Sequence, residues 1–393
     1  MTQHQPAADR TALVLTGGGA RAAYQVGVLK AAAELLPKRA HNPFSIITGT
    51  SAGAVNAVAL GASANNFRLA VKKVERIWSN LHADQVYKAG HLDLLGGVLR
   101  LVFSLLHQGV GVRKPLALLN NAPLAELLSK VIDFNDLDRR IDGGMLDAIG
   151  VTASSYDSGE SVTFYQSKFD GAILPEWRQA RRRGVATRLG LAHLLASSAI
   201  PLILPAARIG KSYYGDGALR QVAPISSAIH LGAQRIMVVG VSGNLKKPPA
   251  EQHRRHSPSL AQMMGHVFNS AFIDALENDM DHIARINELV GIVANENPAV
   301  ETAGLRLVDF LCINPSIEIS GLVSKHIDSL PRGIRNVLKR TGATQSGGGA
   351  SMASYLLFEG GFCRDLIACG YRDAMAESEA LMTFFYPPSS VSI

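Results

Sequence analysis

Ser51 is the central residue of the sequence GTSAG, whose two glycines are Gly49 and Gly53. This spacing matches the G-x-S-x-G nucleophile elbow, in which small residues let a serine occupy a sharp turn between a strand and a helix. The strand-like run 44–48 comes directly before the turn, and the apolar segment 54–60 follows it. Because the motif has the strand and the helix that it requires, we expect Ser51 to be a nucleophile.

A run of three glycines, Gly17 to Gly19, follows the apolar run 12–15 and precedes a segment with helical periodicity. Consecutive glycines are costly to order, so a chain keeps them where its backbone approaches a ligand or a reacting atom closely. Free N–H groups at a helix N-terminus also favour negative charge. We therefore expect Gly17, Gly18 and Gly19 to stabilise the oxyanion that forms when a serine attacks a carbonyl carbon.

Dinucleotide binding is the alternative use of this loop, because Gly17, Gly19 and Ala22 fit the G-x-G-x-x-G/A fingerprint. That fingerprint is accompanied by an acidic residue after the next strand, which holds a ribose hydroxyl. The next strand-like run, 44–48, has no Asp or Glu at its end and leads into the serine turn instead. The sequence therefore favours nucleophilic catalysis over nucleotide binding.

Asp216 is the acid that stands out as a base for the serine hydroxyl. It lies between two glycines, directly after the strand-like run 211–214, where its carboxylate could point into a cleft. An ordinary Asp-Gly turn has the same sequence. The serine, acid, histidine order of the α/β-hydrolases would add a later histidine, such as His230 or His282.

Strand-like and helical segments alternate along the chain and predict a largely parallel sheet that is covered by helices on both faces. The strand-like runs are 12–15, 44–48, 146–153, 161–165, 211–214, 235–241 and 305–313. The helical segments are 20–36, 54–60, most of 67–132, 262–289 and 362–384. The segment 341–354, rich in glycine and serine, is expected to be a flexible loop.

The composition is that of a packed globular protein, with 393 residues of which 47% are hydrophobic and 18% charged. The three cysteines have neither metal-ligand spacing nor the pattern of a disulfide framework, and the N-terminus lacks the apolar segment of a secretory signal. We therefore expect a reduced, cytoplasmic protein. No zinc motif or acidic calcium loop is present in the sequence, and we expect neither a metal nor an organic cofactor.

The segment 92–111 is the most hydrophobic part of the chain, but Arg100 interrupts it and its apolar core is shorter than the roughly 20 residues that span a bilayer. A buried core helix and an interfacial helix that contacts lipid both remain open. The net charge of +7 is partly concentrated in the clusters 181–183 and 253–256. Such clusters suit solvated surfaces or peripheral contact with the inner face of a membrane, and charge alone gives no ground for nucleic-acid binding.

The chain resembles the patatin-like phospholipase family in four motifs: GGGARAAYQVGVL, GTSAGAVNA, LLASSAIPLILPA and YYGDGALRQVAPISSAIHLGA. The resemblance covers 11–242 and implies a three-layer α/β fold, with a central, mostly parallel sheet flanked by helices. On this basis the chain is divided into a tail (1–10), a catalytic domain (11–320) with a helical insertion (67–132), and a C-terminal helical extension (321–393).

The resemblance also implies a catalytic dyad of Ser51 as nucleophile and Asp216 as base, without a catalytic histidine. The oxyanion hole would then consist of backbone N–H groups of Gly17, Gly18, Gly19, Ala20 and Arg21. The Arg21 side chain is expected to order this loop or to meet an anionic headgroup, with a plain surface ion pair as the alternative. The segment 197–201 matches a family segment beside the site, for which we expect a packing role.

A member of this family would be a serine esterase that hydrolyses acyl esters of phospholipids or other lipids through an acyl-enzyme. Ala22 and Ala218 stand where many members have glycine, and these small changes leave the dyad in place. Two alternatives stay open. One is acyl transfer from the same acyl-serine to an alcohol or thiol, and the other is a lipid-surface binding protein with little turnover.

Overall fold

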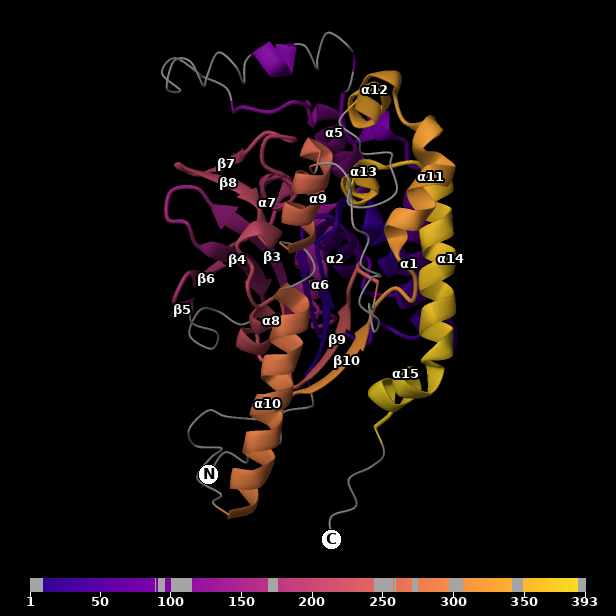
Figure 1. Cartoon of the computed structure of the whole chain (residues 1–393). Helices are drawn as coiled ribbons and strands as arrows, with labels where there is room; N and C mark the ends of the chain where they lie inside the picture. The colour runs from indigo at the N-terminus through magenta and orange to yellow at the C-terminus, as the bar shows by residue number, and fades with distance from the viewer. Residues whose placement is uncertain are drawn as a thin grey trace.

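A mixed sheet forms the centre of the molecule (Figure 1). The computed structural model describes residues 10–88, 90, 96–99, 115–168, 176–243, 257, 259–270, 275–296, 307–340 and 349–387. The strands in these ranges are β1 (Thr11–Leu15), β2 (Ile46–Thr50), β3 (Ala148–Ser155), β4 (Ser161–Ser167), β5 (Arg178–Gln179), β6 (Arg182–Ala186), β7 (Ala207–Ile209), β8 (Ser212–Asp216), β9 (Arg235–Val239) and β10 (Asp309–Ile313). Their order is β10-β9-β1-β2-β3-β4-β6-β5, and β8 pairs with both β3 and β7.

Five neighbouring strands, from β10 through β9, β1 and β2 to β3, run parallel, whereas β4 and β8 are antiparallel to β3. The central strands are buried along nearly their whole length, as expected for apolar runs in a sheet covered on both faces. Leu15 of β1 pairs with Gly49 of β2. Ala153 of β3 pairs with Asp216 of β8. The last residues of β1, β2 and β8 therefore lie at one edge of the sheet.

Helices cover both faces of this sheet. The α-helices are α1 (Ala23–Leu35), α2 (Ala52–Ala62), α3 (Phe67–Ser79), α5 (Ala122–Val131), α6 (Phe134–Asp142), α7 (Leu191–Ser197), α8 (Ser226–His230), α9 (Leu260–Asn269), α10 (Ala275–Glu296), α11 (Val323–His326), α12 (Arg332–Arg340), α13 (Gly349–Leu356), α14 (Gly360–Ala376) and α15 (Ser378–Phe385). Short 3-10 helices are η1 (Gly19–Ala22), η2 (Ala83–Gln85), η3 (Gly217–Leu219), η6 (Ile319–Leu322) and η7 (Ile327–Ser329).

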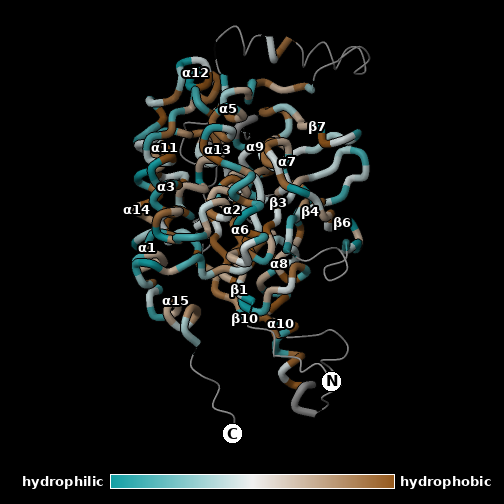
Figure 2. Tube along the Cα trace, turned by 180° about the vertical axis from the view of Figure 1, so that it is seen from behind, coloured by the Kyte–Doolittle hydropathy of each residue, from teal (hydrophilic) through white to brown (hydrophobic). Residues whose placement is uncertain are grey.

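The alternating side chains of β1 divide the core into two parts. Leu13 and Leu15 belong to the apolar cluster that includes α1, α2 and α14, whereas Ala12 and Val14 belong to the cluster that includes α8 and α10. Hydrophobic residues accordingly concentrate in the interior, and hydrophilic segments lie at the margins, near α14 and β6 (Figure 2). The predicted three-layer α/β fold is confirmed.

The C-terminal helices pack directly on this core. α14 runs along α1 on one flank of the molecule (Figure 1). A Cβ atom at Gly27 would lie 2.0 Å from the carbonyl oxygen of Ile367, and one at Gly370 would lie 2.2 Å from that of Tyr24. Glycine on each helix thus lets the two backbones approach closely. The helices after residue 320 share an apolar cluster with the sheet, while the division into a catalytic domain and an extension stays a prediction.

Several sequence-based boundaries differ from the structure. Residues 349–354, expected in a loop, begin α13, because their small side chains suit a helix that packs closely on η1. The predicted C-terminal helix is two helices, α14 and α15, which meet at Glu377. The helix predicted from residue 20 begins as η1. The strands β5, β6 and β7 were not predicted, because they are short and largely polar or exposed.

Several predictions fall wholly or partly outside the described residues. The apolar segment 92–111 is described only at 96–99, which are helical, and the basic cluster 253–256 is not described. The helix predicted over 262–289 corresponds to α9 and α10, between which 271–274 are not described. In the ranges that are described, no helix combines the length and the apolar character needed to cross a bilayer.

Candidate active site

Ser51 occupies the turn between β2 and α2 with φ 55° and ψ −129°, a backbone conformation that is rare for a residue with a side chain. The glycines on either side allow a close approach of backbone segments. A Cβ atom at Gly49 would lie 2.5 Å from the carbonyl oxygen of Gly53, and a Cβ atom at Gly53 would lie 2.3 Å from that of Leu15. This strained turn between a strand and a helix has the geometry of a nucleophile elbow.

Asp216 ends β8, and its carboxylate lies against the Ser51 side chain. The Ser51 hydroxyl donates to Asp216 Oδ2 at 2.6 Å, and the N–H of Ala218 donates to Oδ1 at 3.0 Å. Asp216 has no exposed surface. Its burial raises the pKa of the carboxyl group to about 7, although the two hydrogen bonds act in the opposite direction. The carboxyl group can therefore exchange a proton near neutral pH.

The two histidines that the sequence offered as further members of a triad lie in the described part of the chain. In the described part of the chain, the side chains of Ser51 and Asp216 form no hydrogen bond with a histidine. The ring of His230 stacks on Trp177 at a centroid distance of 4.9 Å, and His282 is exposed on α10. The geometry thus brings the serine directly to the carboxylate.

Ser197, the last residue of α7, supports the serine turn. Its hydroxyl accepts a hydrogen bond from the N–H of Ser51 at 2.8 Å and donates to the carbonyl oxygen of Thr152 at 2.6 Å. The side chain is fully buried. The sequence predicted only a packing role for 197–201, because nothing in the motif indicates which backbone group the hydroxyl meets.

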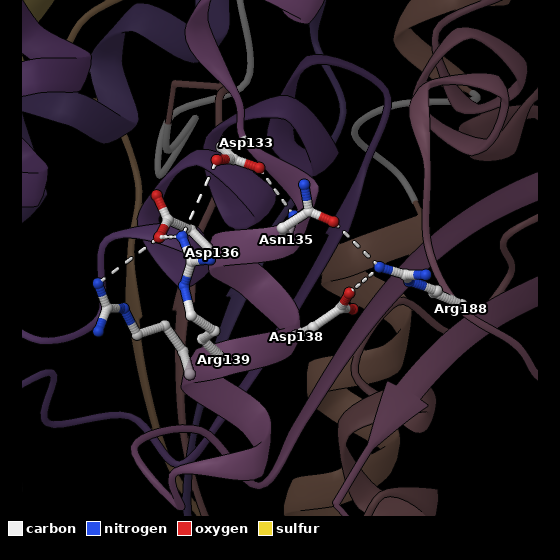
Figure 3. A network of polar contacts seen from close by, with 7 residues as sticks. Asp133, Asn135, Asp136, Asp138, Arg139 and Arg188 are labelled. Atoms are coloured by element: carbon white, nitrogen blue, oxygen red, sulfur yellow. Dashed lines mark hydrogen bonds and ion pairs between the residues drawn. The ribbon is translucent and has the colours of Figure 1, made fainter.

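Polar contacts hold the segment that leads into α7 (Figure 3). Arg188 donates to Asn135 at 3.2 Å and also to Asp138, both on α6. Gln166 of β4 donates to Asp138 at 2.7 Å and accepts from the N–H of Leu189 at 3.0 Å. These contacts fix the start of α7, whose last residue bonds to the serine turn.

The glycine loop continues β1 into η1. Gly19 has φ 54°, and a Cβ atom there would lie 2.2 Å from the carbonyl oxygen of Tyr355 on α13, so the position requires glycine. The N–H of Arg21 donates to the carbonyl oxygen of Gly18 at 3.1 Å and closes the turn. Among the residues that the structure describes, no backbone acceptor binds the N–H groups of Gly17 and Gly18.

The last two residues predicted in this loop are buried. Ala20 has no exposed surface and Arg21 is 4% exposed. The Arg21 guanidinium donates to the hydroxyl of Ser354 on α13 at 2.7 Å, and its burial lowers the pKa of the group. Since the side chain is enclosed by protein, it forms no surface ion pair.

A narrow apolar cavity of about 80 Å³ begins beside Ser51. Gly19 and Ser51 both line it, so the glycine loop and the serine face the same space. The other lining residues come mainly from α2, α3, α5 and the segments that follow α3 and α7: Ala52, Val55, Asn56, Ala59, Val74, Ile77, Trp78, Leu81, Val86, Tyr87, Leu124, Leu127, Leu128, Val131, Ile132, Ser198, Ile200, Leu204, Leu356 and Phe358. A cavity with this lining suits a hydrocarbon chain.

A family comparison matches residues 13–229, more than half of the chain, to the patatin-like phospholipase family. The chain belongs to this family. The match spans the glycine loop, the serine turn and Asp216, and membership supports lipid hydrolysis as the activity of this patatin-like protein.

Solved structures give more distant matches to this patatin-like chain. VipD from Legionella pneumophila is 12% identical, with 95% of this chain and 67% of VipD covered and a TM-score of 0.39. The complex of SpcU with ExoU, from the type III secretion system of Pseudomonas aeruginosa, contains a chain that is 16% identical, with coverages of 88% and 70% and a TM-score of 0.26. No curated protein sequence matches the chain.

Proposed function

We propose that the chain is a serine acyl hydrolase of lipid esters, with Ser51 as nucleophile and Asp216 as its base. The observation that carries this proposal is the 2.6 Å hydrogen bond between the Ser51 hydroxyl and the buried Asp216 carboxylate, beside an apolar cavity. The strained conformation of Ser51 adds support, because it is kept at a cost to stability. The substrate class is a phospholipid or another ester of a long acyl chain.

The cycle has two halves. In the first, Ser51 Oγ attacks the ester carbonyl carbon while its proton passes to Asp216, and the carbonyl oxygen becomes an oxyanion. The tetrahedral intermediate then expels the alcohol, which takes the proton from Asp216, and leaves acyl-Ser51. In the second half, Asp216 takes a proton from a water molecule that attacks the acyl group, and the fatty acid leaves as the Ser51 hydroxyl is restored.

The glycine loop is the proposed oxyanion hole. The N–H groups of Gly17 and Gly18 bind no backbone acceptor among the described residues, and Gly19 lines the same cavity as Ser51. The N–H of Arg21 is used within the turn, so Gly17, Gly18 and Gly19 are the better donors. Loss of one such donor costs roughly 3 to 4 kcal/mol of transition-state stabilisation.

Labelling with a fluorophosphonate probe tests the assignment. The wild-type protein should become labelled and hydrolyse a short-chain ester, whereas Ser51→Ala and Asp216→Asn should do neither. The variants His230→Ala and His282→Ala serve as controls that keep both activities. If either histidine variant lost as much activity as Ser51→Ala, the dyad would be wrong. A wild-type protein that neither labels nor turns over, with lipid vesicles present, would favour the lipid-binding alternative.

Peripheral contact with a lipid surface is proposed for the turn between β5 and β6. Arg182 of β6 pairs with Ser161 of β4, and Ser161 pairs with Ser154 near the end of β3. The neighbouring residue of β3, Ala153, pairs with Asp216. The turn therefore lies at the same edge of the sheet as Asp216. Arg181 is exposed in this turn. We expect Arg181→Glu with Arg182→Glu to reduce flotation with anionic vesicles and to leave hydrolysis of a soluble ester unchanged. Equal flotation of the variant and the wild type would contradict the proposed contact with the lipid surface.

A further inference from the structure

The Arg21 guanidinium is a buried cation that is held by α13. Its Nε donates to Ser354 Oγ at 2.7 Å, and a terminal nitrogen donates to Ser351 Oγ at 2.9 Å. Its central carbon lies 4.1 Å from the centre of the Tyr355 ring. The side chain crosses from η1, near the start of the chain, to a helix about 330 residues later.

No carboxylate in the described part of the chain forms an ion pair with Arg21. Two hydroxyls, a carbonyl oxygen and an aromatic face take its place. Glu318 acts on the guanidinium only from beyond ion-pair distance, and this effect is smaller than that of burial, which lowers the pKa. Burying a cation whose hydrogen-bond partners are all neutral is costly, and a hydrophobic side chain in a well-packed site often gives equal or greater stability. A role in placing the glycine loop accounts for the arginine better than stability does.

The partners of Arg21 are themselves fixed. Ser351 donates to Asn269 Oδ1 at 2.7 Å, and the Tyr355 hydroxyl donates to the same oxygen at 3.2 Å. Ser354 donates to the carbonyl oxygen of Ser351 at 2.5 Å. Each hydroxyl that accepts from Arg21 therefore has its own proton directed elsewhere, which leaves its lone pairs for the guanidinium. The end of α9 thus holds two of the three α13 side chains that contact Arg21, and α13 itself holds the third.

A backbone hydrogen bond connects Arg21 to the glycine loop. Its N–H donates to the carbonyl oxygen of Gly18 at 3.1 Å. That carbonyl belongs to the same planar peptide unit as the N–H of Gly19, which must point the opposite way. On the other side, the carbonyl oxygen of Tyr355 lies against Gly19, where a Cβ atom would approach it to 2.2 Å. The side chain and the backbone of α13 thus set the orientation of the peptide between Gly18 and Gly19.

We propose that α13 acts through Arg21 as a clamp on the glycine loop, and that Arg21 is a positioning residue for the oxyanion hole. The inference rests on the proposed function of that loop. The clamp keeps the N–H groups aimed at the oxyanion before the substrate binds, so that no reorganisation is needed as the charge develops. Neither Arg21 nor α13 needs to touch the substrate.

The variants Arg21→Lys and Ser354→Ala test the clamp, and Arg235→Lys is the matched control. Arg235 is also a largely buried arginine, which contacts Asp309 at 3.5 Å and the Phe384 ring at 4.9 Å, but it lies at the start of β9, at the opposite edge of the sheet. The measurements are kcat and KM for a soluble short-chain ester, the inhibition constant of a trifluoromethyl ketone that binds as a tetrahedral adduct, and the affinity for a fluorescent fatty acid.

Arg21→Lys should lower kcat and ketone affinity together, by about tenfold to a hundredfold, while KM and fatty-acid affinity stay within about twofold. Ser354→Ala should show the same pattern to a smaller extent, and it carries the test if Arg21→Lys does not fold. Arg235→Lys should keep wild-type kcat and ketone affinity. Variants at both clamp positions that fold and keep wild-type ketone affinity would overturn the clamp. A wild-type protein that fluorophosphonate does not label would instead overturn the proposed function.

Discussion

Ala153 of β3 pairs with Asp216 of β8 in antiparallel register, and this pairing brings the Asp216 carboxylate within 2.6 Å of the Ser51 hydroxyl. Ser51 follows β2, which runs parallel to β3 on its other side. A single strand therefore sets the distance between two side chains that are 165 positions apart in the sequence. A Cβ atom at Gly217 would lie 2.2 Å from the carbonyl oxygen of Thr152, so the turn after Asp216 is also fixed against β3.

Hydrolysis by the wild-type protein should rise with pH through about 7. In the proposed mechanism Asp216 must be ionised to accept the Ser51 proton, and its burial raises the pKa of the carboxyl group to about 7. The plot of log kcat/KM against pH should have unit slope below this value and level off above it. A profile that is already flat from pH 5 upward would show that the base ionises at its ordinary pKa.

Asp216→Asn should make the protein more stable at pH 8. The unfolded carboxyl group ionises near 3.8 and the folded one near 7, so between these values the native state holds an extra proton and stability falls as pH rises. Replacing the buried charge with an amide should therefore raise the free energy of unfolding at pH 8, by on the order of 4 kcal/mol. The difference should vanish below about pH 4. Urea unfolding of the wild type and of Asp216→Asn at pH 4 and pH 8 measures this difference in the free energy of unfolding. If the difference were the same at both pH values, the raised pKa would be contradicted.

Ser197→Ala should lower both stability and turnover. The substitution leaves the buried N–H of Ser51 without its acceptor, which costs about 1–3 kcal/mol of unfolding free energy. Since this N–H holds the serine turn in place, kcat should fall while the affinity for a fatty acid stays the same. Ser227→Ala is the matched control, because the buried Ser227 hydroxyl donates to the carbonyl oxygen of Pro224 on the opposite side of the sheet. A Ser197→Ala variant with the kcat of the control would exclude this role.

The serine turn and its acid partner were predictable from the sequence because each is a local signal. A strand, a small-residue turn and a helix stand next to one another around Ser51, and two glycines flank Asp216. The strand β2 was also predictable, since its run is buried on both faces, whereas β8 is only partly buried and was predicted from the short strand-like run 211–214.

The hydrogen bonds that hold the serine turn and the glycine loop in place were not predictable from the sequence. The bond from Ser51 to Ser197 joins residues 146 positions apart, and the bond from Arg21 to Ser354 joins residues 333 positions apart. Such contacts depend on the order of strands in the sheet and on the packing of helices after it. The composition of α13 also prevented its prediction as a helix, because glycine and serine are typical of loops unless tertiary contacts hold them in a helix.

Chain-length preference should depend on Ala59. Ala52, Val55 and Ala59 lie at helical spacing on α2 and line the cavity, which therefore runs along this helix away from Ser51. At 1.5 Å per residue, Ala59 lies about 12 Å from Ser51 along the axis, close to the length of a nine- or ten-carbon chain. Ala59→Phe should therefore block longer chains, lowering kcat/KM for a sixteen-carbon ester by about tenfold or more while a four-carbon ester is cleaved as before.

Overpacking by the phenyl ring will also cost some stability, about 1–3 kcal/mol, so the two esters must be compared on the same folded preparation. Ala59→Ser keeps the volume of the side chain and should keep the wild-type preference. Equal losses on both esters would mean that the ring distorts α2 and the serine turn. An unchanged preference would mean that the acyl chain lies elsewhere, and the cavity along α2 would then be a packing defect of the core. The ratio of the two kcat/KM values thus decides whether the cavity binds substrate.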